Sequence, residues 1–206
     1  MHLYLDSGVT RTLVNDSSIV TEGIFSMTND SIFFTKAQEY RSYSPIGVEQ
    51  PHKFDIYFKG MSTSFSPKKI SNLSAYSIQD INLSSNGNLL FSMTDDDSGS
   101  FFLNTRNFSV SKITTTNDTL RNCMLYSNPI MVNNGLILCS SSYQLVVIDL
   151  KARKEKTILP SSGSHFKCIR YNKKTDLIYF TKTTDRGVIH VVDVNGNELR
   201  TIHLKL

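Results

Sequence analysis

The residues of this chain that could do chemistry do not fall into a known catalytic or metal-binding spacing. Its five histidines form neither the HxH nor the HExxH pattern that zinc sites use. The run Asp95–Gly99 resembles the start of a calcium loop, but position twelve counted from Asp95 is Arg106, where an EF-hand needs glutamate. We therefore interpret Asp95–Gly99 as an acidic turn, and His165 and His190 as structural or surface residues.

Nucleophile, phosphate and disulfide motifs are absent from the sequence as well. No GxSxG or glycine-rich phosphate loop occurs, and Ser161–Ser164 is typical of a flexible linker. Three cysteines without a CxxC spacing argue against a disulfide framework or a zinc site. Cys123 and Cys168 lie 45 residues apart in similar contexts, so we expect both to occupy equivalent buried positions and to stay reduced. The sequence thus predicts no catalytic residue, cofactor or metal.

One segment, Ala37–Lys53, departs from the rest of the chain and holds the candidate binding residues. We predict it to be a long loop between two strands, and long loops in compact repeats are often functional. It contains tyrosine and arginine, the residue types enriched at binding hot spots. The candidate partner-binding residues are Tyr40, Arg41, Tyr43 and His52.

Composition and charge exclude several classes of protein for this chain. The chain has 206 residues, of which 39% are hydrophobic and 19% charged, as is typical of a globular protein. Its net charge is +4, but the lysines and arginines are scattered, and the densest group, Lys151–Lys156, includes Glu155. A nucleic-acid-binding protein would show a basic face with aromatic residues or a groove-entering helix, so we expect no nucleic-acid partner. No run of about 18 apolar residues occurs, so we expect no membrane insertion.

The elements that must position these residues repeat along the chain. Three stretches align without a gap, Asn104–Ile113, Asp149–Ile158 and Asp193–Ile202, and they begin 45 and 44 residues apart. A fixed period of this length indicates stacked supersecondary units. Each unit reads as four short strands, with Asn-Gly or similar turn residues before the second strand. The absence of a 3.6-residue apolar period excludes an α-solenoid, while a β-sandwich stays open as an alternative.

Each strand of the unit has its own residue pattern. The innermost strand is expected at 23–27, 80–83, 123–125 and 168–171, and the second, most apolar strand at 31–34, 88–91, 135–138 and 177–180. The third is expected at 55–58, 100–103, 145–148 and 188–192. The fourth, at 68–70, 110–113, 156–159 and 199–202, mixes lysine or arginine with isoleucine, which fits an outer strand with one wet face. Four-stranded units of about 40 to 50 residues in this order are typical of β-propeller blades.

Two motifs resemble a known family. Leu83–Phe91 has the sequence LSSNGNLLF, which resembles the F-S-P-D-G-K-x-I-A-F repeat of TolB-like propellers, themselves similar to WD-repeat propellers. Phe54–Tyr57 resembles the D-I-Y of the third strand in the same repeats. Ser85 and Asn86 replace the proline and aspartate of that pattern, and the chain has no tryptophan. The resemblance implies a β-propeller, a fold that serves as a protein-binding platform, a sensor domain or occasionally an enzyme.

The number of blades is uneven. His2–Leu13 reads as a third and a fourth strand alone, and whole blades follow at 19–76, 77–117, 118–161 and 162–206. We expect a single all-β domain of about four and a half blades in an incomplete or open ring. We therefore expect the chain to be the C-terminal part of a larger propeller, or a truncated relative of one.

The repeat and the lack of a catalytic constellation favour a non-enzymatic module that binds a protein or peptide partner. Two alternatives are the propeller portion of an enzyme, such as a peptidase or a sugar-processing lyase, and the sensor domain of a membrane-anchored regulator. The N-terminus lacks the basic and apolar regions of a signal peptide, so we expect a cytoplasmic protein if Met1 is the true start. If the chain is a fragment of a secreted propeller, we expect it in the periplasm.

Overall fold

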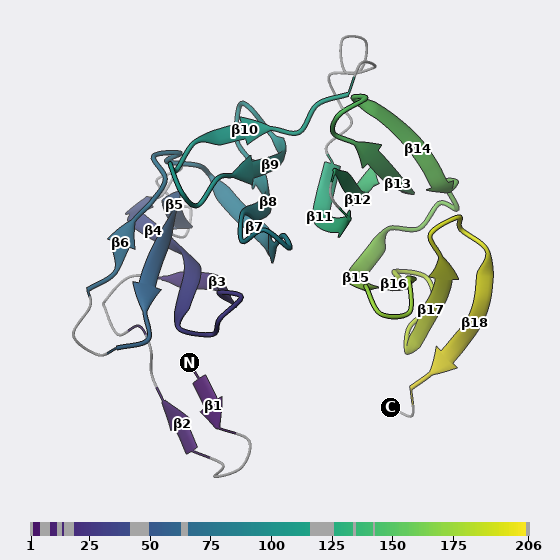
Figure 1. The fold of residues 1–206 in the computed structure, drawn as a ribbon, viewed down its shortest axis with the longest axis horizontal. Coiled ribbons are helices and arrows are strands. Elements are labelled where there is room, and N and C mark those ends of the chain that lie inside the picture. Colours follow the sequence, from purple (N-terminus) through teal and green to yellow (C-terminus); the bar gives the residue numbers. More distant parts are fainter. Residues whose placement is uncertain are drawn as a thin grey trace. The chain divides into compact units, whose positions relative to one another are not determined.

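The chain is built from β-strands. The computed structural model describes residues 2–4, 9–11, 14, 19–41, 50–62, 66–115, 126–133, 135–141 and 143–204, and every regular element among them is a strand. These strands form one two-stranded sheet and four four-stranded antiparallel sheets (Figure 1). The all-β prediction of four-stranded units is confirmed.

The chain divides into two compact units, Met1–Ile78 and Gln79–Leu206. The first unit holds the pair β1 (His2–Tyr4) and β2 (Val9–Arg11), which are antiparallel as expected for an isolated third and fourth strand. It also holds a complete sheet of β3 (Val20–Phe25), β4 (Ser31–Arg41), β5 (Gln50–Gly60) and β6 (Lys68–Lys69).

The second unit contains three sheets, apart from the first two residues of β7. They are β7 (Ser77–Leu83), β8 (Leu89–Thr94), β9 (Gly99–Leu103) and β10 (Val110–Lys112), then β11 (Tyr126–Asn133), β12 (Leu136–Ser141), β13 (Gln144–Asp149) and β14 (Lys154–Leu159). The last consists of β15 (Phe166–Asn172), β16 (Leu177–Lys182), β17 (Val188–Asp193) and β18 (Glu198–His203). In every sheet the strands lie in chain order, each hydrogen-bonded to the next.

The turns between the first and second strands have the backbone conformation that their sequences require. In each of the four sheets one residue of this turn has a positive φ: 56° at Asn29, 83° at Gly87, 109° at Gly135 and 57° at Asp176. Glycine, asparagine and aspartate tolerate this region better than other residues, so the turn chemistry fixes where each hairpin reverses.

The core of the second unit lies between its sheets. Leu90 and Ile113 from the β7–β10 sheet pack against Ile137, Cys139, Val146 and Ile148 from the β11–β14 sheet. The opposite face of that sheet packs on the last sheet, through a cluster of Val132, Leu138, Leu145, Ile158, Phe166, Ile169, Ile178, Phe180 and Val192. The central strands are therefore buried on both faces, because each blade covers the next.

The innermost strands share an irregularity that the sequence pattern did not reveal. Asp80, Asn128 and Cys168 each have a positive φ, of 57°, 53° and 51°. In β11 and β15 the residue lies at a β-bulge, which adds one residue between successive buried positions. Cys168 therefore corresponds to Asn128 rather than to Cys123.

This bulge explains one wrong expectation. In the third sheet the innermost strand is β11, while the strand expected at 123–125 lies outside the described residues, as does Cys123. Cys168 is exposed, because the extra residue turns it away from the core formed by Phe166 and Ile169 on either side. Cys139 is the buried thiol, and burial raises its pKa.

The two described thiols should therefore differ in reactivity. In a Cys123→Ser background, iodoacetamide at neutral pH is expected to alkylate Cys168 quickly, since a thiolate must be accessible to react. Cys139 is expected to react only after unfolding. Mass spectrometry of tryptic peptides over a time course measures both sites. Equal modification of Cys139 and Cys168 in the folded protein would contradict the assignment.

A buried carboxylate organises the first complete sheet. Asp55 in β5 is fully buried, and its Oδ1 accepts hydrogen bonds from Ser71 Oγ at 2.7 Å and from Leu73 N at 2.6 Å. Its Oδ2 lies 2.7 Å from Lys69 Nζ and also accepts a hydrogen bond from Gln38 Nε2. The aspartate of the D-I-Y motif thus joins β4, β6 and the following segment to β5.

Candidate functional site

The strongest departure from the repeat is the hairpin of β4 and β5. Each strand has 11 residues, against six and five in the equivalent β8 and β9. Cross-strand pairing runs without a break in register from Ser31 opposite Gly60 to Ala37 opposite Phe54, and continues to Arg41 opposite Gln50. The expectation of a loop over the whole of Ala37–Lys53 was wrong, because the backbone of both arms pairs as a ladder. We call residues 38–53 the hairpin extension.

The base of the hairpin extension is fixed on both edges. Ala37 N donates to Ile19 O at 3.0 Å. Phe54 and Ala75 exchange two backbone hydrogen bonds, of 2.8 and 3.0 Å. Ala37, Phe54 and Ala75 are all at most 5% exposed. The base of the hairpin extension is thus held by backbone hydrogen bonds on both sides.

The candidate partner-binding residues lie in different parts of this extension. Tyr40 and Arg41 belong to β4, opposite Pro51 and Gln50, and Tyr43 lies outside the described residues. His52 is not a surface contact, since it is only 4% exposed.

Tyr76 packs next to His52, and the centroids of the phenol and imidazole rings lie 5.5 Å apart. Sequence reasoning missed Tyr76, which is 49% exposed beside the hairpin base. Tyr76 directly follows the buried Ala75 in the sequence. Its position near His52 becomes visible only in the structure, because Ala75 pairs with Phe54.

A separate cavity lies at the other end of the same sheet. It has a volume of about 390 Å³ and is lined by Asp30, Ser31, Phe58, Gly60, Met61, Ser62, Ser66 and Lys68. These residues lie at or next to the start of β4, the end of β5 and the start of β6, whereas the hairpin extension includes the end of β4 and the start of β5. Hydrogen bonds from Ser26 and then from Ser31 lower the pKa of Asp30. The Asp30 carboxylate is therefore already engaged by its own turn.

One histidine has the contacts of a structural residue. His190 in β17 is 6% exposed and stacks on Phe180, with ring centroids 5.3 Å apart. Its Nε2 lies 3.0 Å from Asp185 Oδ2 and its Nδ1 3.3 Å from Glu198 Oε1. The imidazole thus joins the β16–β17 turn to β18. Among the residues that the structure describes, no group of three or more His, Cys, Asp or Glu side chains is placed to hold a metal ion.

The acidic run in the second sheet is a turn, as interpreted from the sequence. It joins β8 to β9, and within it Asp95 N donates a hydrogen bond to Ser98 Oγ at 2.9 Å. Lys112 Nζ lies 2.5 Å from Asp97 Oδ1 at the surface. The described part of the chain also contains no helix long and apolar enough to span a membrane.

Comparison with known proteins identifies the fold. No family model matches the chain, and no curated protein does. Among solved structures, a chain of the nidogen/laminin complex superimposes with a TM-score of 0.70 at 11% identity, over 98% of this chain and 70% of that one. A protein from Agrobacterium tumefaciens described as TolB superimposes with a TM-score of 0.64 at 14% identity, over 90% of this chain and 66% of that protein's chain.

An enzyme shares the same architecture. Prolyl oligopeptidase B from Galerina marginata, solved with a 25mer macrocyclization substrate, has a TM-score of 0.60 at 10% identity. The match covers 88% of this chain but only 27% of the enzyme, so this chain spans about a quarter of it. Such low identities show the fold alone, and the neighbours include both an enzyme and a component of a protein complex. Together with the four-stranded antiparallel sheets, they show that this chain has a TolB-like β-propeller fold.

Proposed function

We propose that this chain is a non-enzymatic interaction module that binds a protein or peptide partner through the hairpin extension. The observation that carries the proposal is the length of β4 and β5, which exceed the equivalent strands of every other complete sheet in the structure. A propeller blade needs no such extension to complete its sheet. An anchored hairpin that continues past the blade supplies surface for a partner.

The chemistry of the hairpin extension supports this proposal. Tyr40 and Arg41 are consecutive residues of its first arm, and the exposed Tyr76 lies beside its base. Tyrosine and arginine combine apolar area with hydrogen-bonding groups, and both are enriched at binding hot spots. The nidogen chain that shares the fold was solved in a complex with laminin, which shows that this architecture is compatible with protein binding in that case.

Shortening the hairpin should abolish partner binding without unfolding the sheet. Replacing residues 40–51 by Asn-Gly joins Glu39 to His52 through a tight turn, which keeps their cross-strand pairing and the contact of His52 with Tyr76. We expect recovery of cross-linked partners from native cells to fall at least about tenfold, since loss of hot-spot contacts costs roughly 2 kcal/mol or more. Quantitative mass spectrometry measures the recovery.

The matched control shortens the equivalent hairpin of the second sheet. Replacing Asp95–Ser98 by Asn-Gly joins Thr94 to Gly99 and should leave partner recovery unchanged. Circular dichroism and thermal unfolding check that both variants fold. Equal recovery with the wild-type and the shortened β4–β5 hairpin would refute the proposal.

A further inference from the structure

The last two sheets have the same register, so their residues can be compared position by position. In the β11–β14 sheet, Ile130 pairs with Leu138, Leu138 with Val147, and Val147 with Lys156. In the β15–β18 sheet, the matching series is Arg170, Tyr179, Val191 and Arg200. Residues paired across neighbouring strands lie on one face of a sheet, so each series marks one face. Beyond a bulge in β14, Leu159 pairs with Leu145 and corresponds to Ile202, which pairs with Ile189.

This face is covered in the third sheet, whereas in the last sheet Arg170 and Arg200 are exposed around the half-buried Tyr179 and the buried Val191. Ile130, Leu138, Val147 and Leu159 pack against the β15–β18 sheet, where Leu159 is half-buried. Its counterpart Ile202 is 37% exposed, and Leu204 just beyond β18 is 49% exposed. We call the surface marked by Lys167, Arg170, Tyr179, Arg200, Ile202 and Leu204 the terminal face. It is the side of the sheet opposite the cluster formed by Phe166, Ile169 and Phe180.

The terminal face has changed chemically as well as in exposure. Where the third sheet has Ile130, the terminal face has Arg170, and where the third sheet has Leu138 it has Tyr179. Lys167 lies on the same side of β15 and is exposed, as are Arg170 and Arg200. A buried leucine and a half-buried isoleucine of the third sheet thus correspond to tyrosine and arginine in the last, residue types enriched in interfaces between separate proteins.

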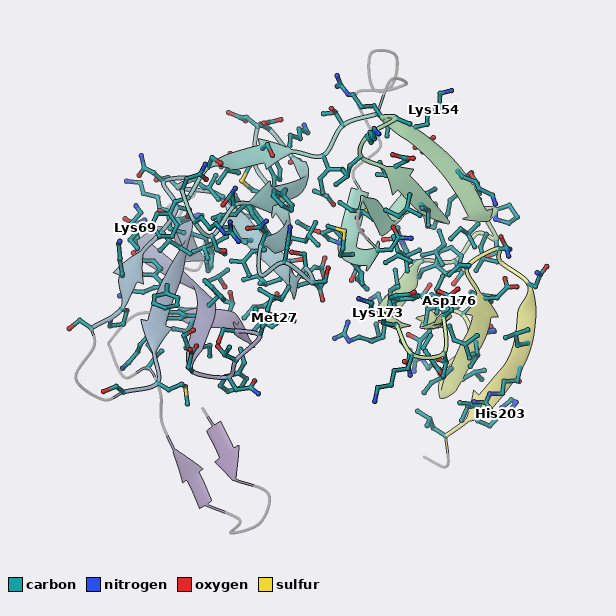
Figure 2. The ribbon with its side chains drawn as sticks, viewed as in Figure 1. Met27, Lys69, Lys154, Lys173, Asp176 and His203 are labelled. Atoms are coloured by element: carbon teal, nitrogen blue, oxygen red, sulfur yellow. The ribbon has the colours of Figure 1, made fainter. Side chains whose placement is uncertain are left out.

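The cations of the terminal face have no carboxylate partner among the described residues, and the nearby carboxylates are engaged elsewhere. Asp176 accepts a hydrogen bond from Tyr171 Oη at 2.6 Å, on the hairpin where Figure 2 labels Lys173 and Asp176. Asp193 accepts hydrogen bonds from its own turn, at 2.8 Å from Asn195 N and 2.9 Å from Asn197 N. Glu198 faces His190 on the other side of the sheet.

We propose that the terminal face binds an acidic, amphipathic segment of a partner protein. Carboxylates of that segment would meet Lys167, Arg170 and Arg200, while aliphatic side chains would cover Ile202 and Leu204. A second copy of this chain is a poor occupant, because pairing of the face with itself would bring like charges together. The inference rests on the proposed function in that the partner is a protein, but it names a different surface from the hairpin extension.

A designed peptide tests this chemistry directly. The probe is a fluorescein-labelled peptide that alternates glutamate with valine and leucine, and its counterpart has lysine in place of every glutamate. We expect fluorescence anisotropy to show binding of the glutamate peptide that weakens with added salt, and no binding of the lysine peptide. The double variant Lys167→Glu with Arg170→Glu should weaken binding at least about tenfold.

The matched control reverses two cations elsewhere. Lys151→Glu with Lys154→Glu makes the same change in net charge at the exposed β13–β14 turn, where Figure 2 labels Lys154, and it should leave binding unchanged. Ile202→Ser tests the apolar part and should weaken binding several-fold while preserving its salt dependence. Circular dichroism confirms that each variant is folded.

The outcomes separate this inference from the proposal for the hairpin extension. Normal peptide binding by the shortened β4–β5 hairpin supports the terminal face as an independent site, whatever the fate of the hairpin proposal. The inference is overturned if the Lys151/Lys154 variant weakens binding of the glutamate peptide as much as the Lys167/Arg170 variant does. It is also overturned if the lysine peptide binds as well as the glutamate peptide. Tighter binding of single-stranded oligothymidylate, with displacement of the peptide, would also overturn it and indicate a nucleic-acid surface.

Discussion

Replacing Asp55 by alanine is expected to lower the free energy of unfolding of the first unit by about 3 kcal/mol, because buried hydrogen-bond donors lose their acceptor, while the partly exposed Lys69 can still reach solvent. The carboxylate is fully buried and receives four polar groups from three segments. Without it, Leu73 N and the Lys69 ammonium lose their acceptor inside the protein. Urea unfolding followed by circular dichroism measures the loss, and hydrogen exchange locates it to β5 and β6.

Two further variants separate charge from packing at this position. Asp55→Asn keeps the size of the side chain but removes the charge and brings an amide donor toward existing donors, so we expect a smaller loss of about 2 kcal/mol. Asp97→Asn breaks an exposed ion pair with Lys112 and should change stability by no more than about 0.5 kcal/mol. Stability of Asp55→Ala equal to that of Asp97→Asn would show that the buried network is unimportant.

The regular part of each blade was predictable from local sequence. The second and third strands are short apolar runs between turn residues, and Asn29, Gly87, Gly135 and Asp176 take the positive φ that the turn sequences indicated. These features depend on neighbours in the chain, so a single sequence contains the information. The fold followed because the pattern recurs with a nearly constant period.

The innermost strands were harder to predict because bulges break their alternation. An extra residue at Cys168 reverses which side chains face the core, so the expectation that Cys168 is buried was wrong. A period-of-two pattern cannot reveal a bulge unless the partner strand is known. For the same reason, the sequence alone did not show that Arg170 occupies the position of Ile130.

The candidate site depended on contacts that the sequence does not display. His52 is separated from Tyr76 along the chain, yet their rings meet because Phe54 pairs with Ala75. The strand character of both arms of the hairpin extension was also missed, because Pro51 and the charged residues there are typical of loops. Backbone pairing with a neighbouring arm overrode these local preferences. The choice of Tyr40, Arg41 and Tyr43 as partner contacts stays a prediction.

Replacing Gly196 by alanine is expected to destabilise the second unit by about 2 to 4 kcal/mol. Gly196 lies in the turn before β18 with a φ of 89°, a conformation that costs a non-glycine residue about 1 kcal/mol or more. A Cβ at this position would also lie 2.3 Å from Ile158 O and 2.9 Å from its Cγ2, in the preceding sheet. Relief of that overlap requires the two sheets to move apart, and overpacking of this kind typically costs about 1 to 3 kcal/mol.

Gly87→Ala is the matched control for this effect. Gly87 has nearly the same φ, 83°, but an added Cβ would meet nothing within 4 Å. It should therefore show only the conformational cost, about 1 kcal/mol. The difference between the two variants in thermal and urea unfolding isolates the close approach of the β17–β18 turn to β14. Equal losses would mean that the turn can shift without disturbing Ile158, and that packing between these sheets tolerates a side chain at Gly196.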